Sequence, residues 1–169
     1  MKFAETRTAL PGETLRERID FTAILDQAIS SLSFMEGFSN VRFKSNVSVT
    51  KNFYNDKKLI TPIVQHLIHN AIRYRKDNIP DACVKIAMED DPDGVKITVS
   101  DNGVGIGGNV QEAIDKMFAR VTEKIPGHGL GLFTVNHCIR KLDGRITLES
   151  KESVGTTVMV WVRNEGNGG

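Results

Sequence analysis

The chain has 169 residues, 40% of them hydrophobic and 25% charged, and its formal net charge at pH 7 is +1. These values predict one globular domain with a sizeable hydrophobic core, and they exclude nucleic-acid or membrane binding that depends on bulk charge. No apolar run approaches the length of a membrane-spanning helix, so we expect no direct membrane insertion.

The first third of the chain contains one predicted helix and three predicted strands. Residues 1–13 are irregular and form a predicted linker from an upstream region. A short strand over 16–19 precedes a helix over about 20–32, whose apolar residues fall on one face. Residues 41–47 and 49–54 have strand-like patterns, and we expect them to pair with each other in an antiparallel hairpin.

The middle of the chain contains a long helix, a hairpin and a glycine-rich loop. The helix extends over about 55–74 and carries its apolar side chains on one side. Apolar residues alternate with polar or small ones over 84–88 and again over 95–99, with an Asp-Pro-Asp-Gly turn between them, which predicts a hairpin. A glycine loop over 101–108 then leads into a short helix over 110–118.

The last third of the chain begins with residues 119–128, which lack a core pattern and are predicted to be mobile. A helix over about 132–142 follows, and then two strands around 146–148 and 158–162. The polar, glycine-rich tail over 164–169 is predicted to be disordered. Helices interspersed with strand pairs favour a mixed or mainly antiparallel sheet with helices on one face.

Four polar side chains follow one stripe of the predicted long helix. His66, Asn70, Arg73 and Tyr74 fall at positions i, i+4, i+7 and i+8. An amide can give a neutral oxygen to magnesium, a guanidinium can orient a phosphate, and a phenol can lie against a base. In isolation, however, such a stripe is more often an ordinary solvated helix face.

Two glycine-rich segments favour the interpretation that the helix stripe is part of a ligand-binding site. Asp-Asn-Gly-Val-Gly-Ile over residues 101–106 follows a strand, and the Asp101 carboxylate can accept a hydrogen bond from an adenine amino group. Gly-His-Gly-Leu-Gly-Leu over 127–132 precedes a helix, where backbone N–H groups attract phosphate, and Leu130 and Leu132 could line an apolar pocket. The chain has neither a Walker loop nor a Rossmann βαβ unit, which excludes the two commonest nucleotide loops.

The chain resembles the ATP-binding catalytic domain of bacterial sensor histidine kinases, a branch of the GHKL ATPase superfamily. Asn-Ala-Ile-Arg-Tyr over 70–74 resembles the N box of that family. Residues 101–106 resemble its first glycine box, and Lys-Met-Phe over 116–118 its F box. Residues 127–132 resemble the second glycine box, and Gly-Thr-Thr over 155–157 resembles the closing Gly-Thr element. Five elements in the family order make the resemblance highly specific.

The resemblance covers residues 14–163 and implies a fold of the Bergerat type. This fold is an α/β two-layer sandwich, in which helices cover one face of a mixed, mainly antiparallel sheet. The resemblance also implies a mobile lid over ATP, which residues 119–128 would form.

The resemblance further implies ATP and Mg²⁺ as cofactors and a role for each matching position. Asn70 would coordinate magnesium, Arg73 would contact phosphates, and Tyr74 would contact the adenine ring. Asp101 would bind the adenine amino group, with Thr156 as a helper through a water molecule. The other cofactor-binding positions would surround the base and the phosphates: Gly103, Gly105, Ile106, Gly127, Gly129, Leu130, Gly131 and Leu132.

His66 occupies a position where the resemblance is incomplete. Many sensor kinases have asparagine four residues before the position of Asn70, and the hydrolytic relatives have a glutamate base there. The lack of glutamate predicts a domain that binds Mg-ATP with little turnover on its own. Chemotaxis-type kinases resemble this chain in having histidine, so we hypothesise that His66 lies near the γ-phosphate and is catalytic together with Asn70. A histidine hydrogen-bonded locally on the helix face is an equally good interpretation.

The chain has no phosphoacceptor motif, so we expect the acceptor histidine on a separate helical hairpin of the same full-length protein, with a response regulator downstream. The isolated domain is expected to be cytoplasmic and monomeric, with no nucleic-acid partner, although full-length proteins of this type are often membrane-tethered. Two alternatives remain open: a protein-serine kinase of the anti-sigma-factor type, and a non-catalytic module that senses ATP or ADP.

Overall fold

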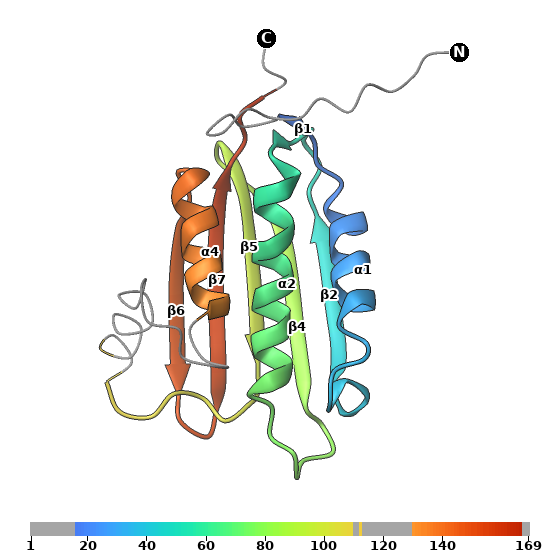
Figure 1. Cartoon of the computed structure of the whole chain (residues 1–169), viewed down its shortest axis with the longest axis vertical. Helices are drawn as coiled ribbons and strands as arrows, with labels where there is room; N and C mark the ends of the chain where they lie inside the picture. The colour runs from blue at the N-terminus through green and yellow to red at the C-terminus, as the bar shows by residue number, and fades with distance from the viewer. Residues whose placement is uncertain (1–15, 110–111, 113–129, 167–169) are drawn as a thin grey trace.

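Three helices cover one face of a five-stranded sheet in the computed structural model, which describes residues 16–109, 112 and 130–166 (Figure 1). The described elements are β1 (Glu17–Arg18), α1 (Phe21–Ser31), the 3₁₀ helix η1 (Phe38–Asn40), β2 (Arg42–Ser48), β3 (Tyr54–Asn55), α2 (Lys57–Arg73), β4 (Cys83–Asp91), β5 (Gly94–Asp101), α4 (Leu130–Lys141), β6 (Arg145–Lys151) and β7 (Gly155–Arg163).

The sheet has the strand order β2-β4-β5-β7-β6, and only β2 runs parallel to its neighbour. β4 and β5 form the predicted hairpin, in which Ile86 lies opposite Val99. β7 pairs with both β5 and β6, so that Asp101 and Ser150 flank Thr156 on either side. The end of β5 therefore meets the turn between β6 and β7, which lies some fifty residues further along the chain.

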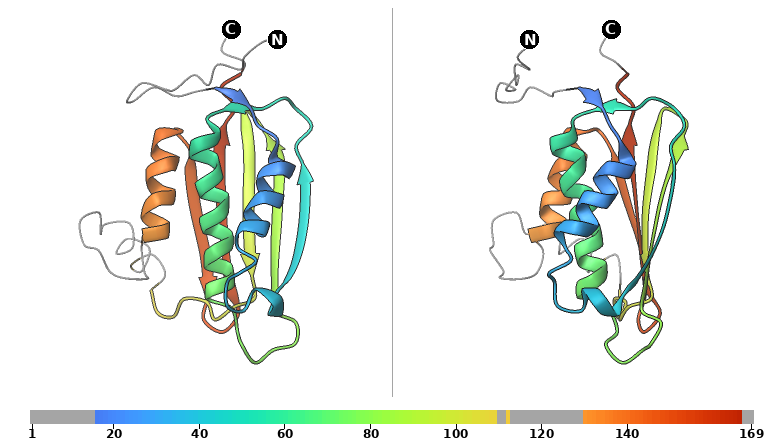
Figure 2. Two further views of the ribbon diagram at one scale, coloured as in Figure 1. Left: turned by 45° about the vertical axis from the view of Figure 1, so that its right-hand side comes forward. Right: turned by 90° about the vertical axis from the view of Figure 1, so that its right-hand side faces the viewer.

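The core lies between the helices and the sheet, because each strand presents alternate side chains to the same face (Figure 2). Ile86 and Ile97 on neighbouring strands are only 2% and 0% exposed. The helix α2 contributes a buried stripe at helical spacing: Ile60, Ile63, Val64, Leu67, Ile68, Ala71 and Ile72. Burying each such large aliphatic side chain contributes about 1.5–3 kcal/mol, so this interface holds α2 firmly on the sheet.

Both helices of the first half begin at aspartate caps. The Asp20 side chain accepts a hydrogen bond from Ala23 N at 3.1 Å, and that of Asp56 accepts one from Lys58 N at 3.0 Å. The strand over 16–19, the hairpin over 84–99 and the helices over 20–32, 55–74 and 132–142 are confirmed, with small shifts at their ends. The predicted mixed, mainly antiparallel sheet with helices on one face is confirmed as well.

The predicted pairing of residues 41–47 with 49–54 is wrong. β2 instead pairs in parallel with β4, with Arg42 opposite Cys83. The intervening segment is held by other contacts: Thr50 N donates to Asp90 Oδ2 at 2.8 Å, and the buried Phe53 ring packs edge-on against Phe21 at 5.1 Å. An alternating pattern identifies the face that a strand buries, but it does not identify the neighbouring strand.

The end of the chain differs from the predicted disordered tail over residues 164–166. Asn164 Oδ1 accepts a hydrogen bond from Tyr54 N at 3.1 Å, and Asn164 Nδ2 donates to Asn52 O at 2.9 Å. The predicted linker over 1–13 and residues 167–169 lie outside the described residues, as do the lid over 119–128 and nearly all of the predicted helix over 110–118. No helix in the described part of the chain is long and apolar enough to span a membrane.

Candidate functional site

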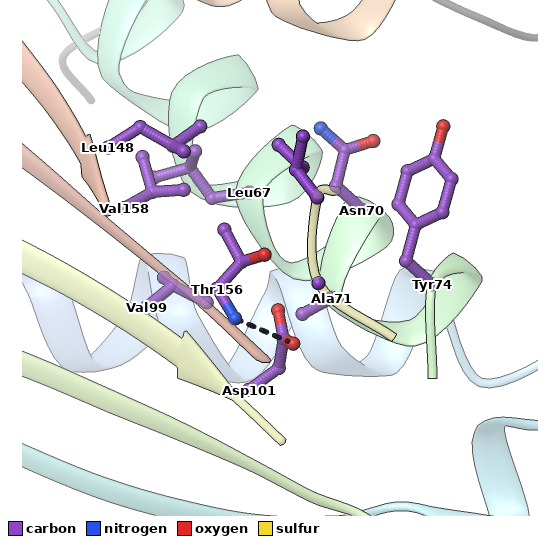
Figure 3. Close-up of a pocket in the computed structure, with 11 residues that line it drawn as sticks. Leu67, Asn70, Ala71, Tyr74, Val99, Asp101, Leu148, Thr156 and Val158 are labelled. Carbon is purple, nitrogen blue, oxygen red and sulfur yellow. Dashed lines mark hydrogen bonds between the residues drawn. The ribbon is translucent and has the colours of Figure 1, made fainter. Parts of the chain in front are cut away.

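A cavity of about 250 Å³ lies between the C-terminal half of α2 and the ends of β5 and β7 (Figure 3). It brings together three segments that are far apart in the sequence. The residues that line it are Leu67, Asn70, Ala71, Tyr74, Val99, Asp101, Gly105, Ile106, Leu148, Thr156 and Val158. Six of these were predicted as site residues from the sequence: Asn70, Tyr74, Asp101, Gly105, Ile106 and Thr156.

Asp101 is the charged group of this cavity, and the end of β5 holds it in place. Its Oδ1 atom accepts hydrogen bonds from Gly103 N at 2.9 Å and from Thr156 N at 3.3 Å. No described residue donates to Oδ2, so this oxygen remains available as an acceptor for a ligand. Burial raises the pKa of the Asp101 carboxyl, and the two backbone N–H groups partly oppose that effect.

With Asp101 as the predicted acceptor for an adenine amino group, its raised pKa predicts that adenosine binding weakens at a higher pH than it would with an aspartate of ordinary pKa. The charged carboxylate accepts from an amino group, and protonation removes that charge-assisted bond as the pH falls through the raised pKa. We expect adenosine affinity to fall by about tenfold, as for the loss of one such bond. Calorimetric titration with adenosine avoids the titration of phosphate groups, and an Asp101→Asn variant should show a flat profile.

Of the four residues in the polar stripe of α2, two line the cavity and two do not. Asn70 and Tyr74 line the cavity, across from Asp101 and Thr156 in the view of Figure 3. Arg73 is exposed, and its guanidinium carbon lies 5.6 Å from the centre of the Tyr74 ring. Tyr74 thus lies between the cavity and a cation, and the residue is 37% exposed.

His66 lies on the same helix but does not line the cavity, and it is half-buried. Burial lowers the pKa of His66, and the nearby His69 lowers it further. Both effects favour the neutral imidazole. The predicted roles of His66 and Arg73 near the phosphates concern a region beyond this cavity and stay predictions.

The two glycines of the first glycine-rich segment allow close contacts with other parts of the backbone. A Cβ atom at Gly103 would lie 2.3 Å from Tyr74 O, which also accepts a hydrogen bond from Val104 N at 2.9 Å. A Cβ atom at Gly105 would lie 2.0 Å from Lys151 O. The loop is therefore seated between the end of α2 and the β6–β7 turn, which the sequence pattern did not reveal.

The second glycine-rich segment is only partly described. Gly127 and Gly129 lie outside the described residues, whereas Leu130, Gly131 and Leu132 form the first turn of α4. Their predicted roles along the phosphates and beside the base stay predictions.

Apolar side chains form most of the cavity wall, and the sequence analysis did not single them out. Val99, Leu148 and Val158 come from three strands of the sheet, and Leu67 and Ala71 come from α2. Each follows the same alternation or helical spacing as the core residues, so nothing in the local sequence separates a cavity wall from a packed core. Such walls suit a flat heterocyclic ring, with Asp101 as the orienting polar group.

The donor set of the site fits Mg²⁺ bound together with a nucleotide. Within the described ranges, no group of three or more His, Cys, Asp or Glu side chains is arranged to hold a metal ion. Asn70 offers one amide oxygen at the cavity edge. Magnesium commonly takes only one or two protein oxygens and fills its octahedron with phosphate oxygens and water, so one such ligand is sufficient.

The family model described as histidine kinase-, DNA gyrase B-, and HSP90-like ATPase matches residues 55–166. Sensor protein RprX of Bacteroides fragilis (strain YCH46) is 27% identical over 149 residues, and sensor histidine kinase CpxA of Escherichia coli (strain K12) is 25% identical over 162 residues. These matches cover 85% and 94% of this chain but 28% and 34% of the two relatives. The chain thus spans about a third of the length of these relatives.

The solved structure of the mycobacterial sensor histidine kinase MprB has a similar fold, with a TM-score of 0.71 at 20% identity. The similarity covers 88% of this chain and 97% of the MprB chain. The two chains therefore share one fold over nearly their whole lengths.

Proposed function

This chain belongs to the histidine kinase-, DNA gyrase B-, and HSP90-like ATPase family, and we propose that it is the ATP-binding catalytic domain of a two-component sensor histidine kinase. The observation that carries the proposal is the convergence of Asn70, Asp101 and Thr156 on one cavity with apolar walls. The relative named sensor histidine kinase CpxA supports the same activity. Because the chain covers only about a third of those relatives, the acceptor domain and the response regulator are proposed as partners outside it.

The proposed reaction transfers the γ-phosphoryl group of ATP to a histidine side chain. An imidazole nitrogen of the acceptor forms a bond to the γ-phosphorus, the bond to the β–γ bridging oxygen breaks, and ADP leaves. Mg²⁺, when bound, would neutralise part of the negative charge of the phosphates. Within the chain, Asp101 and Thr156 orient the base, Asn70 offers its amide oxygen to the metal, and Arg73 offers charge to the phosphates.

The acceptor comes from outside the cavity, so the domain needs no strong general base of its own. Consistent with this, no described Asp, Glu or His other than Asp101 lines the cavity, and Asp101 is committed to backbone N–H groups at one oxygen. We therefore propose slow turnover of ATP by the isolated chain. A monomeric state of the isolated domain belongs to the same proposal.

Titration of Mg-ATP into the chain tests the nucleotide site directly. The unmodified chain is expected to bind, and the Asp101→Asn variant to bind about 10–100-fold more weakly, because a charge-assisted hydrogen bond contributes about 1.5–3 kcal/mol. Equal affinities in calorimetry would remove the assignment of Asp101 to the base.

Phosphotransfer with γ-labelled ATP then separates the candidate functions. Acid-labile phosphohistidine on a helical-hairpin acceptor supports the histidine kinase. Acid-stable phosphoserine on an antagonist protein supports the serine kinase of the anti-sigma-factor type. Nucleotide binding without transfer by the full-length protein supports the sensing module.

His66 is proposed to assist the transfer step, because its half-buried imidazole is held towards the neutral form. A His66→Ala variant is expected to bind Mg-ATP with unchanged affinity and to phosphorylate the acceptor about 10²-fold more slowly, as for the loss of a positioning group. Transfer at the full rate by a variant that binds ATP normally would leave His66 with a structural role alone.

A further inference from the structure

We propose that Ser150 is a positioning residue that fixes Thr156 as a hydrogen-bond acceptor at the cavity and thereby favours purines with a 6-amino group over those with a 6-oxo group. The inference rests on the proposed nucleotide-binding function. Ser150 itself does not line the cavity. It lies on β6 directly opposite Thr156 on β7, on the side of the sheet that faces the helices.

The Ser150 hydroxyl makes three close contacts, which link the first glycine-rich loop to the start of β7. Ile106 N donates to Ser150 Oγ at 2.8 Å. Ser150 Oγ lies 2.7 Å from Thr156 Oγ1, and it donates to Gly155 O at 3.1 Å. Two of its three partners, Ile106 and Thr156, line the cavity.

The direction of the Ser150–Thr156 bond follows from counting protons. A serine hydroxyl has one proton and can accept two further hydrogen bonds. The Gly155 carbonyl can only accept, so the Ser150 proton points to it, and the Ile106 N–H can only donate. All three contacts are satisfied only when the Thr156 hydroxyl donates its proton to Ser150. The free side of Thr156 Oγ1 then faces the cavity as an acceptor.

This arrangement leaves two hydrogen-bond acceptors at the inner end of the cavity, Thr156 Oγ1 and an oxygen of Asp101. Asp101 Oδ1 is occupied by two backbone N–H groups, which leaves Oδ2 as the second acceptor. A 6-amino group, directly or through a water molecule, can supply protons to both oxygens. A 6-oxo group would place another acceptor against them, and buried polar groups without partners are costly. Selectivity at the 6-position thus depends on a residue outside the cavity wall.

The sheet supplies a matched control for the loss of a serine–threonine bond. Ser100 on β5 lies opposite Thr157 on β7, and their hydroxyl oxygens are 3.0 Å apart. Since neighbouring residues of a strand face opposite sides, this pair lies on the face of the sheet away from the cavity. Ser100→Ala therefore removes the same kind of contact with β7 without touching the nucleotide site.

The experiment compares ATP with inosine triphosphate, which has an oxygen in place of the 6-amino group, by calorimetry in the presence of Mg²⁺. We expect Ser150→Ala to free the Thr156 proton, to weaken ATP binding by about 3–10-fold, and to narrow the preference for ATP over inosine triphosphate by a similar factor. Ser150→Thr should keep the preference, and Ser100→Ala should leave both affinities unchanged.

Each other outcome overturns the inference. An equal loss of affinity for both nucleotides in Ser150→Ala would mean that Ser150 supports only the shape of the loop. Unchanged affinities would mean that Ser150 neither supports the loop nor orients the Thr156 hydroxyl. If Ser150→Ala does not fold, Thr156→Val serves instead. It should weaken the binding of ATP but not the binding of inosine triphosphate, whereas Thr156→Ser should keep the preference for ATP over inosine triphosphate. An unmodified chain that binds no ATP would instead remove the proposed function, and the inference with it.

Discussion

Replacing Gly155 with alanine is expected to lower the free energy of unfolding by about 3 kcal/mol or more and to abolish measurable ATP binding. Gly155 has φ of +142°, a value that residues with a side chain rarely adopt. A Cβ atom there would lie 2.0 Å from Asp101 O and 3.0 Å from Asn102 Cα. These are backbone atoms, which cannot move aside as a flexible side chain can, so strain and collision add.

The site would be lost together with the stability, because the collision falls between Asp101 and Thr156. Asp101 lies directly opposite Thr156, and Thr156 N donates to its Oδ1 atom. Any separation of β5 and β7 at this point moves both predicted base contacts.

Gly108→Ala is the matched control for this prediction. Gly108 has φ of +75° and no other atom within 4 Å of the position of a Cβ atom. This variant should lose about 1 kcal/mol from backbone conformation alone. Denaturant unfolding of both variants measures the difference, and equal losses for the two would contradict the predicted collision.

The elements of this fold could be predicted from local pattern, but one strand pairing could not. The hairpin of β4 and β5 followed from two alternating runs joined by a short turn, because the turn itself brings the strands together. The partner of β2 lies some forty residues further along the chain, beyond α2. Residues 49–54 had a similar pattern and lay nearer, so proximity in sequence favoured the wrong partner.

The polar residues of the site could be predicted because they form motifs, whereas its walls and its support could not. Asn70 and Asp101 stand in recognisable segments. Leu148 and Val158 line the same cavity, but their sequence pattern is that of ordinary strand residues facing a core. Ser150 has no local signal at all, since its importance arises from contacts with Ile106 and Thr156 that depend on the tertiary structure.

Replacing Asn70 with alanine is expected to slow phosphotransfer by about 10³-fold while changing adenosine affinity by less than about threefold. Asn70 lies at the edge of the cavity on α2, whereas the group that binds the base, Asp101, lies at the end of β5. Removing a ligand that places Mg²⁺ on the phosphates costs several kcal/mol of transition-state stabilisation, and about 4 kcal/mol corresponds to a factor of 10³. The base, by contrast, keeps all of its proposed contacts.

The measurement compares the rate of acceptor phosphorylation from γ-labelled ATP in the full-length protein with adenosine binding by the same variant. Gln65→Ala is the matched control, since it removes an amide from the same helix at a position that does not line the cavity. It should change neither quantity. A parallel fall in adenosine affinity for Asn70→Ala would indicate collapse of the cavity rather than loss of the metal. Transfer at the rate of the unmodified protein would show that the magnesium site lies elsewhere, because no other part of the proposal gives Asn70 a role in the reaction.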